Sequence, residues 1–137
     1  VVCSTNVIEY LINFSRSFIY TTAFSPHSFF SIQAAFERVQ HSAEIIKTLH
    51  ASIQNVSTGL SAYQGYIKSS SPIQVLKFED TETVKRVSAS IQSAGFDVRP
   101  ILSPTVKKGE ERLRICVHAY NTETQIQTLL ETLRINL

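Results

Sequence analysis

The sequence of 137 residues contains no methionine, no tryptophan and only two cysteines. Position 1 is not a methionine, and the opening Val1-Val2-Cys3 has the composition of a short buried strand, so we expect a piece of a longer protein. Cys3 and Cys116 lie far apart in apolar contexts, which favours two buried free thiols, with one disulfide as the alternative.

Long apolar runs and a strong charge of either sign are also missing. No run is long enough to span a bilayer, and no basic start precedes an apolar core as in a signal peptide. The net charge of +2 is too small to indicate a nucleic acid or a membrane surface as partner. With 43% hydrophobic and 18% charged residues, the chain is typical of a globular protein. We expect a cytoplasmic location.

Motifs for metal, nucleotide and triad chemistry are absent as well. The four glycines form no phosphate loop, and the four histidines are scattered without metal-ligand spacing. His41 and His50 fall on a predicted helix, where we expect them to be solvated. No serine or cysteine has a recognisable base beside it in the sequence, so the residues alone do not identify an enzyme.

The first half of the chain reads as mainly helical. A first helix is predicted from Ser4 or Thr5 to about residue 14, followed by an extended segment at 15–26 that is rich in aromatic and hydroxyl side chains. Ser25 is then a candidate N-cap with Pro26 at the first helical position. Apolar residues at three- and four-residue steps predict one long helix from about residue 27 to 56.

That long helix is expected to link two domains, which we place at residues 1–45 and 46–137. Phe29 and Phe30 at its start fit either core packing or a subunit interface.

The second half predicts a small α+β layer. After a short strand at 63–67, the order from about residue 70 is β-α-β-β-α, with helices on one face of a sheet. Pro100 favours an edge position for its strand. The predicted elements are a strand at 73–78, a helix capped by Asp80 or Thr81 and closed by Gly95, strands at 96–102 and 112–118, and a last helix with a Thr122/Gln125 capping box.

Arg114 is the first candidate site residue. Side chains alternate along a strand, so two faces result. The apolar face holds Leu113, Ile115 and Val117, and the polar face holds Arg112, Arg114, Cys116 and His118. A guanidinium held mid-strand after the turn at Gly109 is suited to bind a carboxylate through two parallel hydrogen bonds. The alternative is an ordinary strand with one solvated face.

Hydroxyl side chains provide the other candidates. Thr21 and Thr22 are adjacent and able to bond phosphate oxygens, although threonine also simply favours strands. Thr105, in the turn before the Arg114 strand, is the remaining candidate.

Four segments, in order and at suitable spacing, resemble the C-terminal part of the α-oxoamine synthases. They are residues 13–23, 71–74, 104–109 and 112–115. The resemblance implies a fold-type-I enzyme dependent on pyridoxal 5'-phosphate (PLP) and, at full length, a homodimer with active sites at the subunit interface. Within the family, the best fit is the decarboxylative condensation of L-alanine with pimeloyl-CoA or a pimeloyl carrier protein in biotin biosynthesis.

The resemblance also assigns roles to residues. Thr21 and Thr22 would reach the cofactor phosphate of the neighbouring subunit, Thr105 would lie at the substrate site, and Arg114 would hold the carboxylate of the amino acid or product. The family's Schiff-base lysine, the aspartate on the pyridine nitrogen and the stacking histidine have no match here and are expected upstream. Residues 1–45 would then be the tail of the large PLP-binding domain, and the chain alone would be inactive.

Two classes of alternative stay open. Sister α-oxoamine synthases that use glycine or serine share the same motifs, and residues 118–121 differ from several relatives, which leaves the acyl substrate undecided. Outside the enzymes, a β-α-β-β-α layer on a long helix also fits a regulatory or dimerisation module without chemistry.

Overall fold

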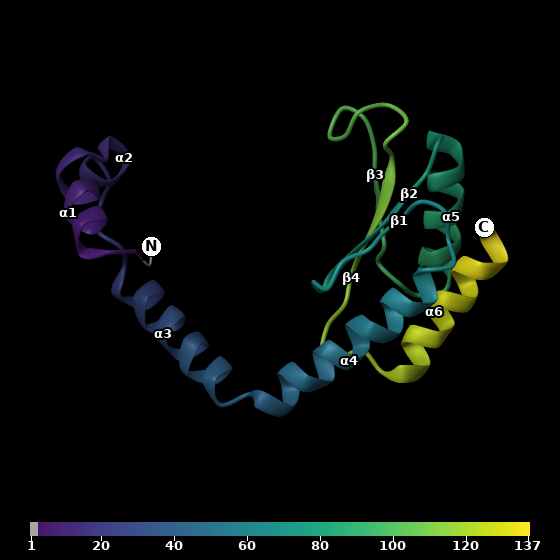
Figure 1. Ribbon diagram of the computed structural model, residues 1–137, viewed down its shortest axis with the longest axis horizontal. Coiled ribbons are helices and arrows are strands. Elements are labelled where there is room, and N and C mark those ends of the chain that lie inside the picture. The colour runs from purple at the N-terminus through teal and green to yellow at the C-terminus, as the bar shows by residue number, and fades with distance from the viewer. Residues whose placement is uncertain (1–2) are drawn as a thin grey trace. The chain divides into compact units, whose positions relative to one another are not determined.

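A computed structural model describes residues 3–137. The chain divides into two compact units, Val1–His41 and Ser42–Leu137. Figure 1 shows the elements of both. The strand predicted at Val1-Val2-Cys3 falls largely outside the described residues; Cys3 itself is partly buried and has no regular secondary structure.

The first unit is helical. It contains α1 (Thr5–Phe14), α2 (Arg16–Ile19) and α3 (Pro26–Gln40), and α1 has the bounds that the apolar spacing predicted. The predicted cap of α3 is confirmed, because the Ser25 side chain accepts a hydrogen bond from the Ser28 backbone N–H at 3.2 Å and Pro26 follows at the start of the helix.

The prediction of an extended segment at 15–26 was wrong in its first part. The Ser15 carbonyl accepts hydrogen bonds from the N–H groups of Phe18 (3.0 Å) and Ile19 (2.9 Å), which closes the short helix α2. Aromatic and β-branched residues favour strands only where a neighbouring strand gives them a surface to pack on. Residues 22–25 do lack helical structure, as expected.

The prediction of one long helix from about residue 27 to 56 was also wrong, because the structure has two helices, α3 and α4 (Ala43–Leu60). At the break, Nδ1 of His41 lies 2.8 Å from the Glu37 carbonyl oxygen, which the His41 backbone N–H also approaches at 3.3 Å. Ser42 then leaves helical geometry with φ −113° and ψ 35°. The apolar spacing runs through this break unchanged, so the spacing could not reveal it.

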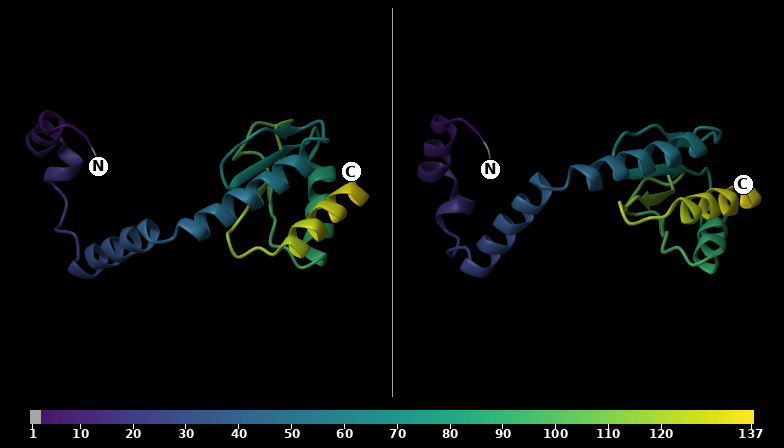
Figure 2. Two further views of the ribbon diagram at one scale, coloured as in Figure 1. Left: turned by 60° about the horizontal axis from the view of Figure 1, so that its bottom comes forward. Right: turned by 90° about the horizontal axis from the view of Figure 1, so that it is seen from below.

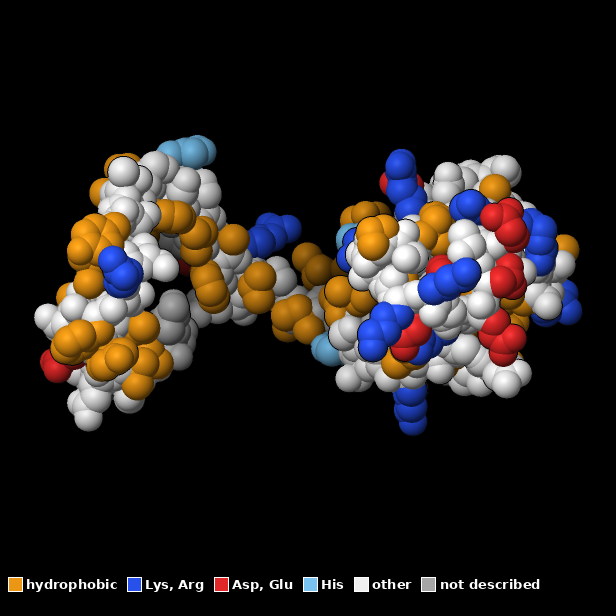
Figure 3. Space-filling model, turned by 90° about the horizontal axis from the view of Figure 1, so that it is seen from above, with side chains coloured by type: hydrophobic (Ala, Val, Ile, Leu, Met, Phe, Trp, Pro, Cys, Tyr) orange, Lys and Arg blue, Asp and Glu red, His pale blue; other side chains and the backbone are white. Residues whose placement is uncertain are grey.

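The first unit has no interior of its own. None of its described residues is buried, and large apolar side chains are exposed along all three helices. Phe14, Phe36 and Tyr20 are 67%, 68% and 81% exposed. Figure 3 shows hydrophobic side chains on the surface of this unit.

The second unit contains an antiparallel sheet with the strand order β1-β2-β4-β3. The strands are β1 (Tyr66–Ile67), β2 (Ile73–Lys77), β3 (Pro100–Ile101) and β4 (Arg112–Cys116). The edge position of Pro100 is confirmed, but β3 has two residues rather than the predicted seven. The Val98 N–H donates to the Phe96 carbonyl at 2.9 Å, so this stretch turns locally instead of extending the ladder.

Three helices cover one face of the sheet, as predicted (Figures 1 and 2). They are α4, α5 (Thr81–Ser93) and α6 (Glu123–Asn136). The predicted caps are confirmed: Asp80 accepts from the Thr83 N–H at 2.7 Å, and Thr122 forms a capping box with Gln125. Gly95 follows α5 with φ +92°.

The core lies between these helices and the sheet. Its most buried apolar side chains come from every layer: Val56, Leu60, Leu76, Val84, Val87, Ile91, Leu113 and Leu133. Three polar side chains are equally buried: Gln74, Ser88 and Glu111. Gln74 of β2 accepts from the Tyr66 hydroxyl at 2.6 Å and donates to the Ser71 carbonyl at 2.7 Å. Gln74 therefore ties the 69–71 loop to the sheet.

The cysteine prediction was partly wrong. Both thiols are free, but Cys116 is exposed and Cys3 is only partly buried. Cys116 lies on the sheet face that carries no helix, because its side chain alternates with those of Ile115 and Val117.

Within residues 3–137, no helix is both long and apolar enough to cross a membrane.

We expect Leu60→Ala to destabilise the chain by about 2–5 kcal/mol, because truncating a fully buried leucine removes apolar contacts and leaves a cavity. Urea unfolding followed by circular dichroism measures this change. Leu137→Ala is the matched control: Leu137 is 50% exposed, and its truncation should change the free energy of unfolding far less. Equal effects of the two variants would contradict the core described here.

Candidate site on the helix-free face of the sheet

The two faces of β4 are as predicted. Leu113, Ile115 and Val117 are at most 4% exposed and pack in the core. Arg114 is exposed on the opposite face, opposite Val75 of β2 in the ladder. A central strand with neighbours on both sides therefore holds the Cα of this arginine in a fixed place.

Most cations around Arg114 already have a carboxylate partner. Glu110 binds both Lys77, at 3.1 Å, and Arg112, at 3.5 Å. Arg99 pairs with Asp97 at 2.7 Å. Arg114 has no carboxylate partner among the described residues, so its guanidinium is available to an acidic ligand.

A cleft of about 620 Å³ lies beside Arg114 in the second unit. Its lining includes Arg114, Cys116, His118 and Tyr120, and also Val56 of α4 and Gln125, Ile126 and Leu129 of α6. The cleft therefore reaches from the helix-free face past the sheet to the helices. The rings of His118 and Tyr120 stack with centroids 4.8 Å apart and planes 7° apart. An apolar and aromatic wall next to an unpaired guanidinium suits a ligand that carries an acid group on an apolar body.

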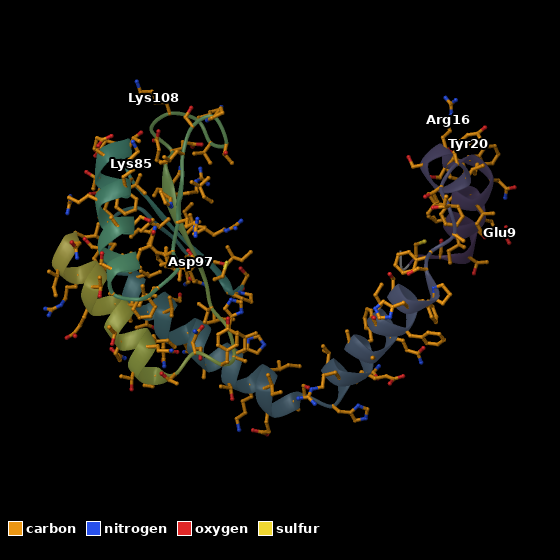
Figure 4. The ribbon with its side chains drawn as sticks, turned by 180° about the vertical axis from the view of Figure 1, so that it is seen from behind. Glu9, Arg16, Tyr20, Lys85, Asp97 and Lys108 are labelled. Carbon is orange, nitrogen blue, oxygen red and sulfur yellow. The ribbon has the colours of Figure 1, made fainter. Side chains whose placement is uncertain are left out.

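The backbone beside these rings is held in place. Asn121 accepts a hydrogen bond from the His118 N–H at 2.7 Å and returns one to the His118 carbonyl through its own N–H at 3.1 Å. Asp97, labelled in Figure 4, also lines the cleft.

Thr105 lies elsewhere, in the exposed loop between β3 and β4. This loop contains a cis Ser103–Pro104 peptide and ends at Gly109, whose φ of +83° favours glycine. Figure 4 labels Lys108 near the loop tip. Among the described residues, the lining of the Arg114 cleft does not include Thr105, so the structure does not bring these two candidates into one cavity.

Thr21 and Thr22 lie in the first unit, directly after α2. Both are exposed, and the Thr21 N–H donates to the Phe18 carbonyl at 3.4 Å. Their side-chain hydroxyls make no hydrogen bond to other described residues, so both are available to a ligand. Arg16 and Tyr20 of the same segment are labelled in Figure 4.

Sequence reasoning missed the two glutamates that directly precede β4, Glu110 and Glu111. The hydrogen bond and charge of Lys77 lower the pKa of Glu110. Backbone N–H donation, from its own residue and from Gly109, lowers the pKa of Glu111 in spite of its burial. The available signal was the Glu110-Glu111 doublet itself, since adjacent strand residues point to opposite faces and only one of the two can be solvated.

One family model covers nearly the whole chain. The family described as aminotransferase class I and II matches residues 1–133. The chain belongs to the aminotransferase class I and II family. The resemblance to PLP enzymes that the sequence motifs indicated is thereby confirmed at the level of this family.

Curated relatives agree with the resemblance to the α-oxoamine synthases. The 8-amino-7-oxononanoate synthase of Emericella nidulans is 38% identical over 142 residues, covering 97% of this chain and 34% of the relative. That of Erwinia tasmaniensis is 36% identical over 132 residues, covering 96% and 34%. The chain thus spans about a third of the length of these relatives.

Two solved structures with the same fold are an 8-amino-7-oxononanoate synthase and a serine palmitoyltransferase. The 8-amino-7-oxononanoate synthase of Francisella tularensis has a TM-score of 0.79 at 25% identity, covering 95% of this chain and 38% of that one. A serine palmitoyltransferase from Sphingomonas wittichii has a TM-score of 0.82 at 18% identity, covering 98% and 35%. The fold is therefore that of a segment of fold-type-I PLP enzymes, as predicted.

Acid is expected to destabilise the second unit through Asp80, Glu110 and Glu111. The Thr83 backbone hydrogen bond lowers the pKa of Asp80, so all three folded-state pKa values lie below the ordinary values of 3.8 and 4.5. A lowered folded-state pKa gives stability that is present above the ordinary value and lost as the pH falls through the folded one. Urea midpoints should therefore fall steadily below pH 4.5.

The matched control for this acid dependence is Glu131→Gln, since Glu131 is an exposed helical residue. Glu110→Gln should flatten the fall in the urea midpoint, whereas Glu131→Gln should leave it unchanged. A midpoint that does not vary between pH 5 and pH 3 would contradict the assigned carboxylate interactions.

Proposed function

We propose that the chain is the C-terminal part of an α-oxoamine synthase that condenses L-alanine with a pimeloyl thioester, releasing carbon dioxide and forming 8-amino-7-oxononanoate. The identity of the curated relatives, 38% and 36%, supports this assignment within the aminotransferase class I and II family. The acyl carrier is coenzyme A or a carrier protein. In this proposal the reaction belongs to biotin biosynthesis, and its cytoplasmic location stays a prediction.

The observation that carries the proposal is the unpaired guanidinium of Arg114. Glu110 forms ion pairs with both Lys77 and Arg112 on the same face, which leaves Arg114 as a cation without a carboxylate partner for a substrate acid to meet. A guanidinium presents parallel N–H donors that match the two oxygens of a carboxylate. We assign Arg114 to the carboxylate of the amino acid or product and Thr105 to the substrate site.

The cofactor of the proposed reaction is PLP, which when bound acts as an electron sink for the carbanion formed on loss of carbon dioxide. Thr21 and Thr22 fit its phosphate group, because two adjacent exposed hydroxyls without protein partners can each donate a hydrogen bond to a phosphate oxygen. We assign them to the phosphate held by the neighbouring subunit of a homodimer.

No residue of this chain is assigned to proton transfer or covalent catalysis. The Schiff-base lysine, the partner of the pyridine nitrogen and the ring-stacking histidine are expected in the upstream part of the protein. The chain by itself is therefore proposed to be inactive, and its role is to bind and orient substrate and cofactor groups.

A second candidate is a sister enzyme, because serine palmitoyltransferase structures reach TM-scores of 0.84. At 21% identity this likeness shows the fold and does not select the amino acid. Assaying alanine, glycine and serine with several acyl thioesters separates these enzymes. A non-catalytic dimerisation module remains the alternative outside the enzymes, and it predicts a full-length protein that binds no PLP.

In the full-length protein, Arg114→Ala should raise the KM for alanine about 30-fold or more, which corresponds to a loss of about 2 kcal/mol for a charged pair that has lost one partner. The KM of Arg114→Lys for alanine should lie between those of the wild type and Arg114→Ala, because lysine keeps the charge but not the parallel donors. Steady-state kinetics at varied alanine concentration measures both.

Arg134→Ala provides the control for the loss of an exposed arginine, since Arg134 lies on α6 away from the helix-free face of the sheet. Its KM for alanine should equal that of the wild type. An unchanged alanine dependence in Arg114→Ala would remove Arg114 from the substrate site.

Replacing both Thr21 and Thr22 by valine in the full-length protein should weaken PLP binding by about tenfold or more, because hydrogen bonds to a charged phosphate are lost. Absorbance titration of the cofactor measures the dissociation constant. The double serine variant retains both hydroxyls and should bind PLP like the wild type. Equal affinities in the valine and serine variants would contradict the assignment.

A further inference from the structure

The two acidic residues before β4 point to opposite layers of the second unit. Glu110 lies on the helix-free face with Lys77 and Arg112. Glu111 is turned toward the helices and is only 1% exposed. Glu111 is the one acidic or basic side chain among the described residues that is buried to this degree, and the proposed reaction does not use it.

Both carboxylate oxygens of Glu111 accept hydrogen bonds from the protein. Oε2 accepts a hydrogen bond from the Gly109 backbone N–H at 2.7 Å, and Oε1 accepts one from the Thr81 hydroxyl at 3.2 Å. Gly109 closes the loop between β3 and β4, and Thr81 is the first residue of α5. The carboxylate therefore joins the end of a loop to the start of a helix.

A role in proton transfer does not fit this geometry. Glu111 is only 1% exposed, and each of its carboxylate oxygens already accepts a hydrogen bond within the protein. A buried charge is costly to desolvate, so it stabilises a particular arrangement only when its bonds are complete, as they are here.

The loop of residues 103–109 has few other attachments. Within it, the Val106 N–H donates to the Leu102 carbonyl at 3.3 Å, and the Glu110 N–H donates to the Lys107 carbonyl at 2.9 Å. These bonds, like the bond from Gly109 to Glu111, join residues close in the chain, whereas the bond from the Thr81 hydroxyl to Glu111 connects the end of the loop to α5. Thr105 is exposed and depends on such attachments for its position.

We infer that Glu111 is a positioning residue that fixes the 103–109 loop against α5 and thereby places Thr105 for the substrate. This inference rests on the proposed function for the role of Thr105, and the attachment of the loop rests on the contacts alone. Glu111 directly precedes β4 and lies three residues before Arg114, so the same carboxylate also fixes the approach to this strand.

The attachment is tested in the chain itself by amide hydrogen exchange. Glu111→Ala removes both acceptors, and the Gly109 amide should then exchange on the order of tenfold faster or more while the Leu113 and Ile115 amides keep their protection. Glu111→Gln is the conservative variant, because its amide oxygen can accept from Gly109 while its NH₂ donates to the Thr81 hydroxyl. Its exchange should match the wild type.

Thr81→Val covers the case in which Glu111→Ala fails to fold. It removes only the bond on the helix side and should raise exchange at Gly109 by a smaller factor, whereas Thr81→Ser should not. Wild-type exchange at Gly109 in the folded Glu111→Ala chain, or in Thr81→Val, would overturn the attachment.

The positioning role is tested in the full-length protein by a double-mutant cycle with Thr105→Val. If Glu111 acts through the loop, Glu111→Ala should lower kcat/KM on the order of tenfold or more, and Glu111→Gln should restore it. The double variant should then lose less than the product of the two single losses, because both changes act on one unit.

The outcomes separate the two proposals. Strictly multiplicative losses, or a kcat/KM in Glu111→Ala equal to that of the wild type, would overturn the positioning role and leave the proposed reaction standing. A wild-type protein that forms no product from alanine and a pimeloyl thioester would overturn the proposed reaction, whereas the exchange result at Gly109 would still decide the attachment.

Discussion

The packing of Leu113 and Ile115 against α4, α5 and α6 is the constraint on which the rest of the second unit depends. Because side chains alternate along β4, burying these two residues puts Arg114 on the open face. A slip of one residue in register would bury the guanidinium and expose the core. The energy of apolar burial therefore sets the direction in which a charged group is presented, and the site needs no separate device to aim Arg114.

Charge pairing then determines which cation is available. Glu110 lies between Lys77 and Arg112 and satisfies both, and Asp97 satisfies Arg99. These exposed pairs add little stability by themselves. Their effect here is selective, since each neighbouring cation has a carboxylate partner and Arg114 has none among the described residues. The apolar and aromatic wall of the cleft supplies the rest of a surface for an acid on an apolar body.

Much of the second unit could be predicted from the sequence because its signals are local. The caps at Asp80 and Thr122, the edge position of Pro100 and the alternation around Arg114 each depend on neighbouring residues. The errors arose where distant or side-chain contacts decide. The break at His41 depends on a ring nitrogen near a carbonyl, and the exposure of Cys116 depends on which face the helices cover. The candidate residues could be named, but nothing in the sequence reports the partners of Glu111.

The absence of buried residues among those described in the first unit has a thermodynamic consequence. Heat capacity and enthalpy of unfolding both scale with the surface that folding removes from water. Helices α1 to α3 remove little such surface within their own unit, so they contribute little to either quantity. In a calorimetric scan of this chain, we expect the main peak to come from the sheet and its three helices, and we expect α1 to α3 to lose their helicity gradually over a broad range of temperature.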